Sequence, residues 1–187
     1  LVVCRRMVAA RLLGAIADAP FALPGIVLSI AFILAFLRPL PLLGFSLYGT
    51  AWIILAAYLS RFLALGLRPT MAGMAQIDPG YEEAAQLAGA GSFRRLVRIV
   101  LPTAAPAAAA GALLIFMSAY NELTVSALLW SAGNETIGVM IFNLYDEGSA
   151  TAAAAASVIS IVVTLAAAAL ASLAARHLPT GTLPWQA

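Results

Sequence analysis

The strongest constraint in this sequence is the placement of its charged residues, because four long windows contain none. The windows cover residues 19–37, 39–60, 99–121 and 148–175. A helix needs about 20 apolar residues to cross a bilayer, so each window is close to that length or longer. Backbone groups in lipid have no water to bond, and these windows do not alternate between polar and apolar residues. They therefore predict membrane-spanning helices and exclude barrel strands.

The composition excludes the main soluble classes. Of the 187 residues, 63% are hydrophobic and only 10% are charged, whereas about a quarter of an average soluble domain is charged. Such a chain cannot cover a soluble surface, and it is too apolar for disorder. The net charge is +2, and the sequence has no long run of basic residues that would indicate nucleic-acid binding. The single cysteine, Cys4, cannot form an intrachain disulfide.

We therefore predict an all-α, polytopic bundle of about four transmembrane helices. The expected spans are residues 21–37, 46–66, 103–121 and 151–173, within a transmembrane domain of residues 21–178. We expect residues 1–20 to lead into the first span and residues 179–187 to form a tail after the last span. Both segments should lie on the same side of the membrane.

The arginines predict the orientation of this bundle. Every basic residue except Arg38 falls on the side that holds both termini and the segment between the second and third spans. The positive-inside rule places that side in the cytoplasm. Arg61 lies at the end of the second window, where we expect its side chain to snorkel to the interface.

The segment 71–101 is polar enough to leave the membrane. Asp78 is a suitable N-cap, and Pro79 suits the first position of a helix. Gly89 or Gly91 can end that helix in a left-handed conformation. The segment should therefore begin as a short helix followed by a glycine turn.

A second, basic helix is expected after the glycine turn. Ser92 can cap it, and it carries Arg94, Arg95 and Arg98. We expect it to run to Leu101 and to stop at Pro102, because proline cannot continue the backbone hydrogen bonding of a helix. The third span would follow directly.

The spacing of residues within this segment indicates a protein family more specifically than its helix caps do. The pattern E-A-A-x3-G-x9-I-x-L-P is filled by Glu83, Ala84, Ala85, Gly89, Ile99, Leu101 and Pro102. It resembles the cytoplasmic loop of permease subunits of binding-protein-dependent ABC importers, and the surrounding chain resembles that family from about residue 20 to 178. Within the family, residues 121–130 and 135–139 are most similar to ferric iron-type permeases.

The resemblance implies that the segment is a coupling helix seated in a groove of a cytoplasmic ABC ATPase dimer. Glu83 could pair with a basic group there, and Ala84 and Ala85 are small enough to seat closely. It further implies alternating access in the bacterial inner membrane, a periplasmic substrate-binding protein and a second permease unit, as a homodimer or a fused half. ATP and Mg would bind the partner, since this sequence holds no G-x-x-x-x-G-K-[ST] loop. This chain is thus predicted to bind no cofactor or metal and to be no enzyme.

A polar cluster at the far end of the third span is a candidate substrate path. It consists of Ser118, Tyr120, Asn121 and Glu122. A carboxylate near hydrocarbon is a functional-site hypothesis, but Glu122 could equally lie in water at the outer interface. Ferric iron is the first substrate hypothesis, and thiamine, polyamine, sulfate and phosphonate stay open.

Other classes of function are less well supported by the residues. An intramembrane Ser–His protease needs a histidine in the bundle, and the only histidine, His177, follows the last span. A secondary transporter or a scaffold without an ATPase stays open. Permease units of the family have at least five or six helices. This sequence predicts four spans, and its first residue is Leu1. We therefore expect it to be the C-terminal part of a longer chain.

Overall fold

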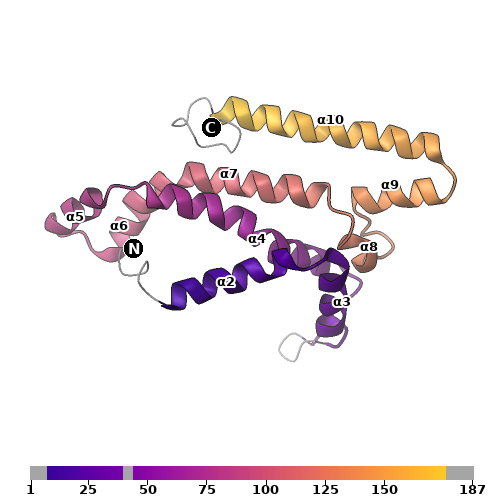
Figure 1. Cartoon of the computed structure of the whole chain (residues 1–187), viewed down its shortest axis with the longest axis horizontal. Coiled ribbons are helices and arrows are strands. Elements are labelled where there is room, and N and C mark those ends of the chain that lie inside the picture. The colour runs from indigo at the N-terminus through magenta and orange to yellow at the C-terminus, as the bar shows by residue number, and fades with distance from the viewer. Residues whose placement is uncertain (1–7, 40–43, 176–187) are drawn as a thin grey trace. The chain divides into compact units, whose positions relative to one another are not determined.

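The computed structural model describes residues 8–39 and 44–175, and every regular element in these ranges is helical (Figure 1). His177 and the expected tail of residues 179–187 lie outside them. The elements are α2 (Val8–Ala22), α3 (Gly25–Phe36), α4 (Ala51–Ala75), α5 (Pro79–Leu87), α6 (Ser92–Arg95), a π-helical turn (Leu96–Val100), α7 (Leu101–Tyr120), α8 (Ser126–Leu129), α9 (Ile137–Asp146) and α10 (Ala150–Ala175). The prediction of an all-α fold is confirmed.

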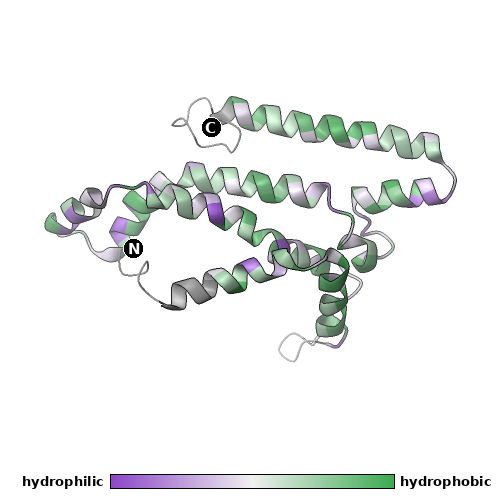
Figure 2. Ribbon diagram, in the orientation of Figure 1, coloured by the Kyte–Doolittle hydropathy of each residue, from purple (hydrophilic) through white to green (hydrophobic). Residues whose placement is uncertain are grey.

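Three helices in this part of the chain are long and apolar enough to cross a membrane. They cover Ala51–Ala75, Ser92–Tyr120 and Ala150–Leu173, and Figure 2 shows α10 as almost uninterrupted hydrophobic ribbon. A fourth candidate consists of α2 and α3, which are bent by 112° at the break between them. Pro24 explains this break, since it lacks an N–H and disfavours helical geometry in the residue before it. The first expected span therefore falls on α3 and the end of α2, and this bent pair forms either a broken span or a re-entrant loop.

The second long helix begins later in the sequence than the charge-free window suggests. Residues 44–50 form turns, and α4 then extends from Ala51 to Ala75. Residues 71–75, which we assigned to the polar segment, therefore belong to α4. Arg61 lies in the interior of α4, about 15 Å from its first residue, and not at its end as the sequence suggested.

The described residues form two compact units. The first unit comprises residues up to 64 together with 117–163, and the second comprises 65–116 together with those from 164 onward. In the first unit, apolar residues of α4 are buried, as are residues of α3, α8, α9 and α10. The buried set includes Leu28, Ile53, Ile54, Ala57, Phe62, Val125, Leu129, Val139 and Ala153.

In the second unit, α4 and α7 approach closely because glycines face the neighbouring helix. A Cβ added to Gly66 would lie 2.6 Å from Ile115 Cδ1, and one added to Gly73 would lie 2.5 Å from Ala107 Cβ. Small residues allow membrane helices to pack with their backbones close together. The glycines of this pair thus set the distance between the two helices.

The helix that begins at Ser92 does not stop at Pro102, and this part of our prediction was wrong. The helix continues without a break from Ser92 to Tyr120. The reason is the π-helical turn Leu96–Val100, in which the N–H of Leu101 donates to the carbonyl of Leu96. The wider turn directly before Pro102 accommodates a residue that would otherwise clash with the preceding carbonyl.

Candidate functional site

The polar loop between α4 and α7 begins with a capped helix. Asp78 is the N-cap of α5, and its Oδ1 accepts a hydrogen bond from the N–H of Gly80 at 2.8 Å. Pro79 is the first helical residue. Both predictions for this helix start are confirmed. Asp78 lies at the N-terminal end of the helix, where the helix dipole favours negative charge, and the exposed Glu83 lies at the middle of the helix.

Of the two glycines that the sequence offered as the end of α5, Gly89 ends it in a left-handed conformation. Its φ angle is +74°. The N–H of Ala90 donates to the carbonyl of Ala85 at 2.9 Å, and the N–H of Gly89 donates to that of Gln86 at 3.0 Å. These two bonds form a Schellman motif, which satisfies carbonyls at the helix end. Of the small residues in the E-A-A-x3-G pattern, Ala85 and Gly89 thus build the turn itself.

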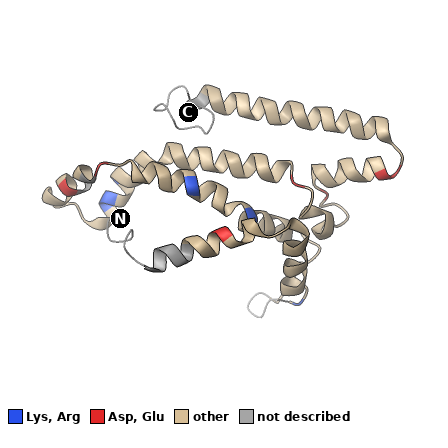
Figure 3. Cartoon of the chain, in the orientation of Figure 1, with Lys and Arg blue, Asp and Glu red and all other residues tan. Residues whose placement is uncertain are grey.

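The second helix of the loop starts one residue earlier than expected. Gly91 is the N-cap of α6, and its φ of −64° is ordinary, so Ser92 is the first helical residue and not the cap. Arg95 contacts both helices: it donates to Gln86 Oε1 at 3.4 Å and to Ser92 Oγ at 3.3 Å. Figure 3 shows basic residues on α6 and acidic residues on α5. Arg95 therefore helps to hold the two short helices together.

Large apolar side chains on this loop are open to solvent. Leu87 at the end of α5 is 91% exposed, Phe93 on α6 is 79% exposed, and Tyr81 is also exposed. Exposed apolar groups of this size at a polar loop mark a candidate interaction surface. Sequence reasoning missed these residues, because an apolar residue on a short helix is usually buried.

The remaining motif residues lie at the junction of the loop with α7. Ile99 belongs to the π-helical turn and is half-buried, and Leu101 and Pro102 are exposed at the start of α7. Thr103 donates its hydroxyl to the carbonyl of Ile99. Because the helix is continuous here, a displacement of the loop would be transmitted directly to α7.

The candidate substrate path lies at a break in the chain. After α7 ends at Tyr120, residues 121–125 are not regular helix. Ser118 and Tyr120 are half-buried on the last turn of α7, while the exposed Asn121 donates from Nδ2 to the carbonyl of Met117 at 2.9 Å.

Glu122 is buried, with 8% of its surface exposed. Its Oε1 accepts from the hydroxyl of Thr124, and its Oε2 accepts from the N–H of Val125 at 2.8 Å. The carboxylate therefore stabilises the turn that leads into α8. Its role in a substrate path stays a prediction.

A buried hydrogen-bond network surrounds this turn. The hydroxyl of Tyr58 donates to the carbonyl of Glu122 at 3.1 Å, and Ser126 Oγ donates to the same carbonyl at 3.2 Å. Thr136, the N-cap of α9, donates to Ser126 Oγ at 3.0 Å. Ser29 of α3 donates to the carbonyl of Val125, at 2.9 Å. The network joins α3, α4, α8 and α9, and fully satisfied networks of this kind fix a single arrangement.

Arg61 of α4 lies beside this network. Its Nε and Nη1 are buried and have no hydrogen-bond partner among the described residues. A Cβ added to Gly25 would lie 2.5 Å from Arg61 Nη1 and would overlap the hydroxyl of Thr124. Nη1 and this hydroxyl therefore lie beside each other at the first residue of α3. Sequence analysis placed Arg61 at the end of a window and expected its side chain to snorkel to the interface, whereas Nε and Nη1 are buried in the structure.

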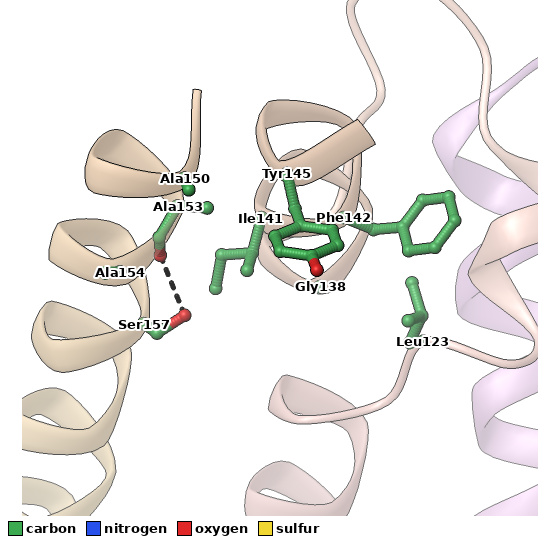
Figure 4. A pocket seen from close by; sticks show the side chains of 9 residues that line it. All are labelled: Leu123, Gly138, Ile141, Phe142, Tyr145, Ala150, Ala153, Ala154 and Ser157. Atoms are coloured by element: carbon green, nitrogen blue, oxygen red, sulfur yellow. Dashed lines mark hydrogen bonds between the residues drawn. The ribbon is translucent and has the colours of Figure 1, made fainter. Parts of the chain in front are cut away.

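An apolar groove of about 410 Å³ lies between α9 and α10 (Figure 4). Its lining residues are Leu123, Gly138, Ile141, Phe142, Tyr145, Ala150, Ala153, Ala154 and Ser157. The hydroxyl of Ser157 donates a hydrogen bond to the carbonyl of Ala153 at 2.8 Å. None of the lining side chains carries a charge at neutral pH, so the groove does not suit an ionic solute. Over residues 8–39 and 44–175, no group of three or more His, Cys, Asp or Glu side chains could hold a metal ion.

Comparison with known proteins identifies the family. Residues 5–179 match the family described as the binding-protein-dependent transport system inner membrane component. The chain belongs to this family. The family resemblance that the E-A-A-x3-G-x9-I-x-L-P spacing indicated is confirmed, and the chain is a multi-pass membrane protein of a transport system rather than an enzyme in itself.

Named relatives differ in what they are said to transport. The chain is 30% identical over 146 residues to a 2-aminoethylphosphonate transport system permease protein, PhnU of Salmonella typhimurium, covering 71% of this chain and 50% of the relative. It is 30% identical over 128 residues to the ferric transport system permease protein FbpB of Actinobacillus pleuropneumoniae, covering 68% of this chain and 18% of the relative. The chain thus spans half or less of the length of these curated relatives.

A solved structure shows the same fold. It is a bacterial ABC transporter involved in the import of the acidic polysaccharide alginate. The match has a TM-score of 0.72 at 18% identity and covers 94% of this chain and 70% of the other. The predicted permease-like helix bundle is confirmed by this match.

Proposed function

We propose that this chain is the permease subunit of an ATP-driven ABC importer, which moves a solute across the bacterial inner membrane by alternating access. The family match supports this role, as do the names of the relatives. The observation that carries the proposal is the loop of α5 and α6. It combines the seven-residue motif with an exposed apolar surface that a partner protein would cover.

The partner is a cytoplasmic ABC ATPase dimer, which binds ATP and Mg. Glu83 and the small Ala84 face solvent on α5, and Leu87 and Phe93 provide apolar contact area on either side of the Gly89 turn. Closure of the ATPase dimer would displace this loop, and the continuous helix from Ser92 to Tyr120 would carry the movement to the break at residues 121–125.

The other partners follow from the same function. A periplasmic binding protein delivers the solute, and a second permease unit, either another copy or a fused half, completes the path. Both ends of the described chain lie on the cytoplasmic side. Ser118, Tyr120, Asn121 and Glu122 remain the first candidates for the path, since they lie where the helix is interrupted.

Two substrates have support from specific observations. The similarity of residues 121–130 to ferric iron-type permeases favours ferric iron, as does the relative named for ferric transport. The chain is also 30% identical to the relative named for 2-aminoethylphosphonate transport, which supports an organic anion as the second candidate.

Co-purification and uptake test the proposal together. The full-length permease is co-expressed with its ATPase and binding protein and reconstituted in proteoliposomes, where solute uptake is expected to require ATP. Phe93→Ser should reduce the amount of ATPase that co-purifies. Phe45→Ser is the matched control, because Phe45 is also exposed but lies in the turns before α4 on the predicted opposite side. Uptake without ATP, or equal ATPase recovery from both variants, would contradict the proposal.

A further inference from the structure

Three separate segments are hydrogen-bonded together where α3 ends and α4 begins. The hydroxyl of Ser46 donates to the carbonyl of Phe36, the last residue of α3, at 2.7 Å and accepts from the N–H of Tyr48 at 3.1 Å. The carbonyl of Gly49 accepts from Ser131 Oγ at 2.8 Å. We call these segments the aromatic cap, and they comprise residues 36–38, 45–52 and 130–131.

Large aromatic side chains of the aromatic cap are exposed. Trp52, in the first turn of α4, is 66% exposed, and three further aromatic residues of the cap are also exposed. They are Phe45, Tyr48 and Trp130. Tryptophan and tyrosine combine an apolar ring with a polar N–H or O–H, and they are enriched at membrane–water interfaces. Their position at the ends of two apolar helices therefore favours such an interface.

Trp52 is also the first residue of an apolar stripe along α4. Leu55, Leu59 and Leu63 follow it at intervals of three and four residues, which places the four side chains on one face of the helix. All four are exposed, and α4 is a candidate membrane span. Lipid tails are as apolar as leucine, so hydrocarbon suits this stripe. The surface thus continues from the aromatic cap into a region that lipid tails would cover.

A basic residue gives the aromatic cap a charge that complements a lipid headgroup. Arg38 is exposed and lies two residues after the end of α3. An arginine at the end of an apolar helix extends its charged group toward the membrane surface, and its guanidinium matches the geometry of a phosphate. Phosphate groups of phospholipids lie at that level.

We propose that the aromatic cap lies in the headgroup layer of the bilayer, with Trp52 and Trp130 at its boundary with the hydrocarbon and Arg38 on a lipid phosphate. The partner is therefore phospholipid and not a protein. The stripe that continues along α4 and the charge of Arg38 both favour lipid. Such contacts fix the depth at which α4 begins. The inference requires only that the chain spans a membrane, and it is independent of the proposed import function.

Tryptophan fluorescence of the full-length permease in lipid nanodiscs tests this placement. Each variant keeps either Trp52 or Trp130, and every other tryptophan is replaced by phenylalanine. Lipids brominated near the headgroup should quench both residues more strongly than lipids brominated at the chain ends, and aqueous iodide should quench them weakly.

Two reference positions calibrate the depth in a background without native tryptophans. Leu165→Trp, at an exposed position inside α10, should be quenched most by bromine at the chain ends. Leu87→Trp, on the polar loop, should be quenched most by iodide. Quenching of Trp52 by iodide as strong as that of Leu87→Trp would overturn the proposal. So would a lack of quenching of Trp52 and Trp130 by either brominated lipid, which is the result expected if a protein partner covers the aromatic cap.

The phosphate contact of Arg38 has its own test. Tyr48→Trp, as the sole tryptophan, reports on lipid at the end of α3, because Ser46 links residue 48 to Phe36. Brominated phosphatidylglycerol, which has a net negative charge, should quench it more strongly than brominated phosphatidylcholine. Arg38→Gln should abolish this difference, and Arg68→Gln, an exposed control in α4, should preserve it. Equal quenching by the two lipids, or a difference that persists in Arg38→Gln, would overturn the assignment of Arg38.

Discussion

Gly66 of α4 and Gly111 of α7 are in direct backbone contact. A Cβ at position 111 would lie 2.6 Å from the carbonyl oxygen of Gly66 and 2.9 Å from its Cα. Neither atom can move unless the helix backbones separate. Only glycine at position 111 is compatible with this approach, which fixes the packing of the helix that follows the loop.

Gly111→Ala should therefore destabilise the protein, although alanine is the better helix former. The exchange gains about 1 kcal/mol in helix propensity, but overpacking against backbone costs about 1–3 kcal/mol. Gly14→Ala in α2 is the control, since no described atom lies within 4 Å of a Cβ there. Thermal unfolding of the full-length permease in nanodiscs should show a lower Tm for Gly111→Ala than for Gly14→Ala. The reverse order would show that α4 and α7 are not in contact here.

Ser29→Ala should loosen the packing of α3 on α8. Ser29 is fully buried, and its hydroxyl lies 2.9 Å from the carbonyl of Val125 and from that of Gly25 in its own helix. Loss of the donor leaves a buried carbonyl unsatisfied, at a cost of about 1–3 kcal/mol. Ser157→Ala, which removes a bond within α10, should cost less. Unfolding in denaturant compares the two, and equal midpoints would argue against the α3–α8 bond.

Gly89→Ala should impair coupling through the backbone alone. The φ of Gly89 is +74°, and a Cβ there would meet nothing within 4 Å among the described atoms, so strain of about 1–2 kcal/mol is the main effect. Gly89→Asn tolerates the left-handed conformation better and should retain more ATP-driven uptake. Gly91→Ala, at an ordinary φ of −64°, is the control in the same turn. If all three variants transport equally, the left-handed turn is not needed.

Local features of the loop could be predicted from the sequence because their partners lie a few residues away. The cap at Asp78 and the left-handed Gly89 each depend on contacts within five residues. The helix end at Pro102 was predicted wrongly. Its effect depends on whether the preceding turn widens, and the sequence around it does not reveal that choice.

The polar contacts around the break could not be predicted. Arg61, Gly25 and Thr124 come from three separate segments, and their meeting depends on how α3 packs on α4 and on the chain after α7. The exposure of Leu87 and Phe93 was missed for a related reason. Apolar residues on a short helix normally pack inward, and only the arrangement of α5 and α6 shows that these two do not.

Site-directed cross-linking tests the central claim most directly. In a background without native cysteines, Cys4 included, Leu87→Cys is introduced into the full-length permease and co-expressed with the ATPase. Because Leu87 is 91% exposed on the loop, we expect a cross-link to the ATPase whose yield changes with ATP, and labelling from the cytoplasmic side. Tyr145→Cys, on α9 at the predicted opposite side, should be labelled only from outside. Labelling of Leu87→Cys from outside, or no cross-link to a co-expressed ATPase, would contradict the account.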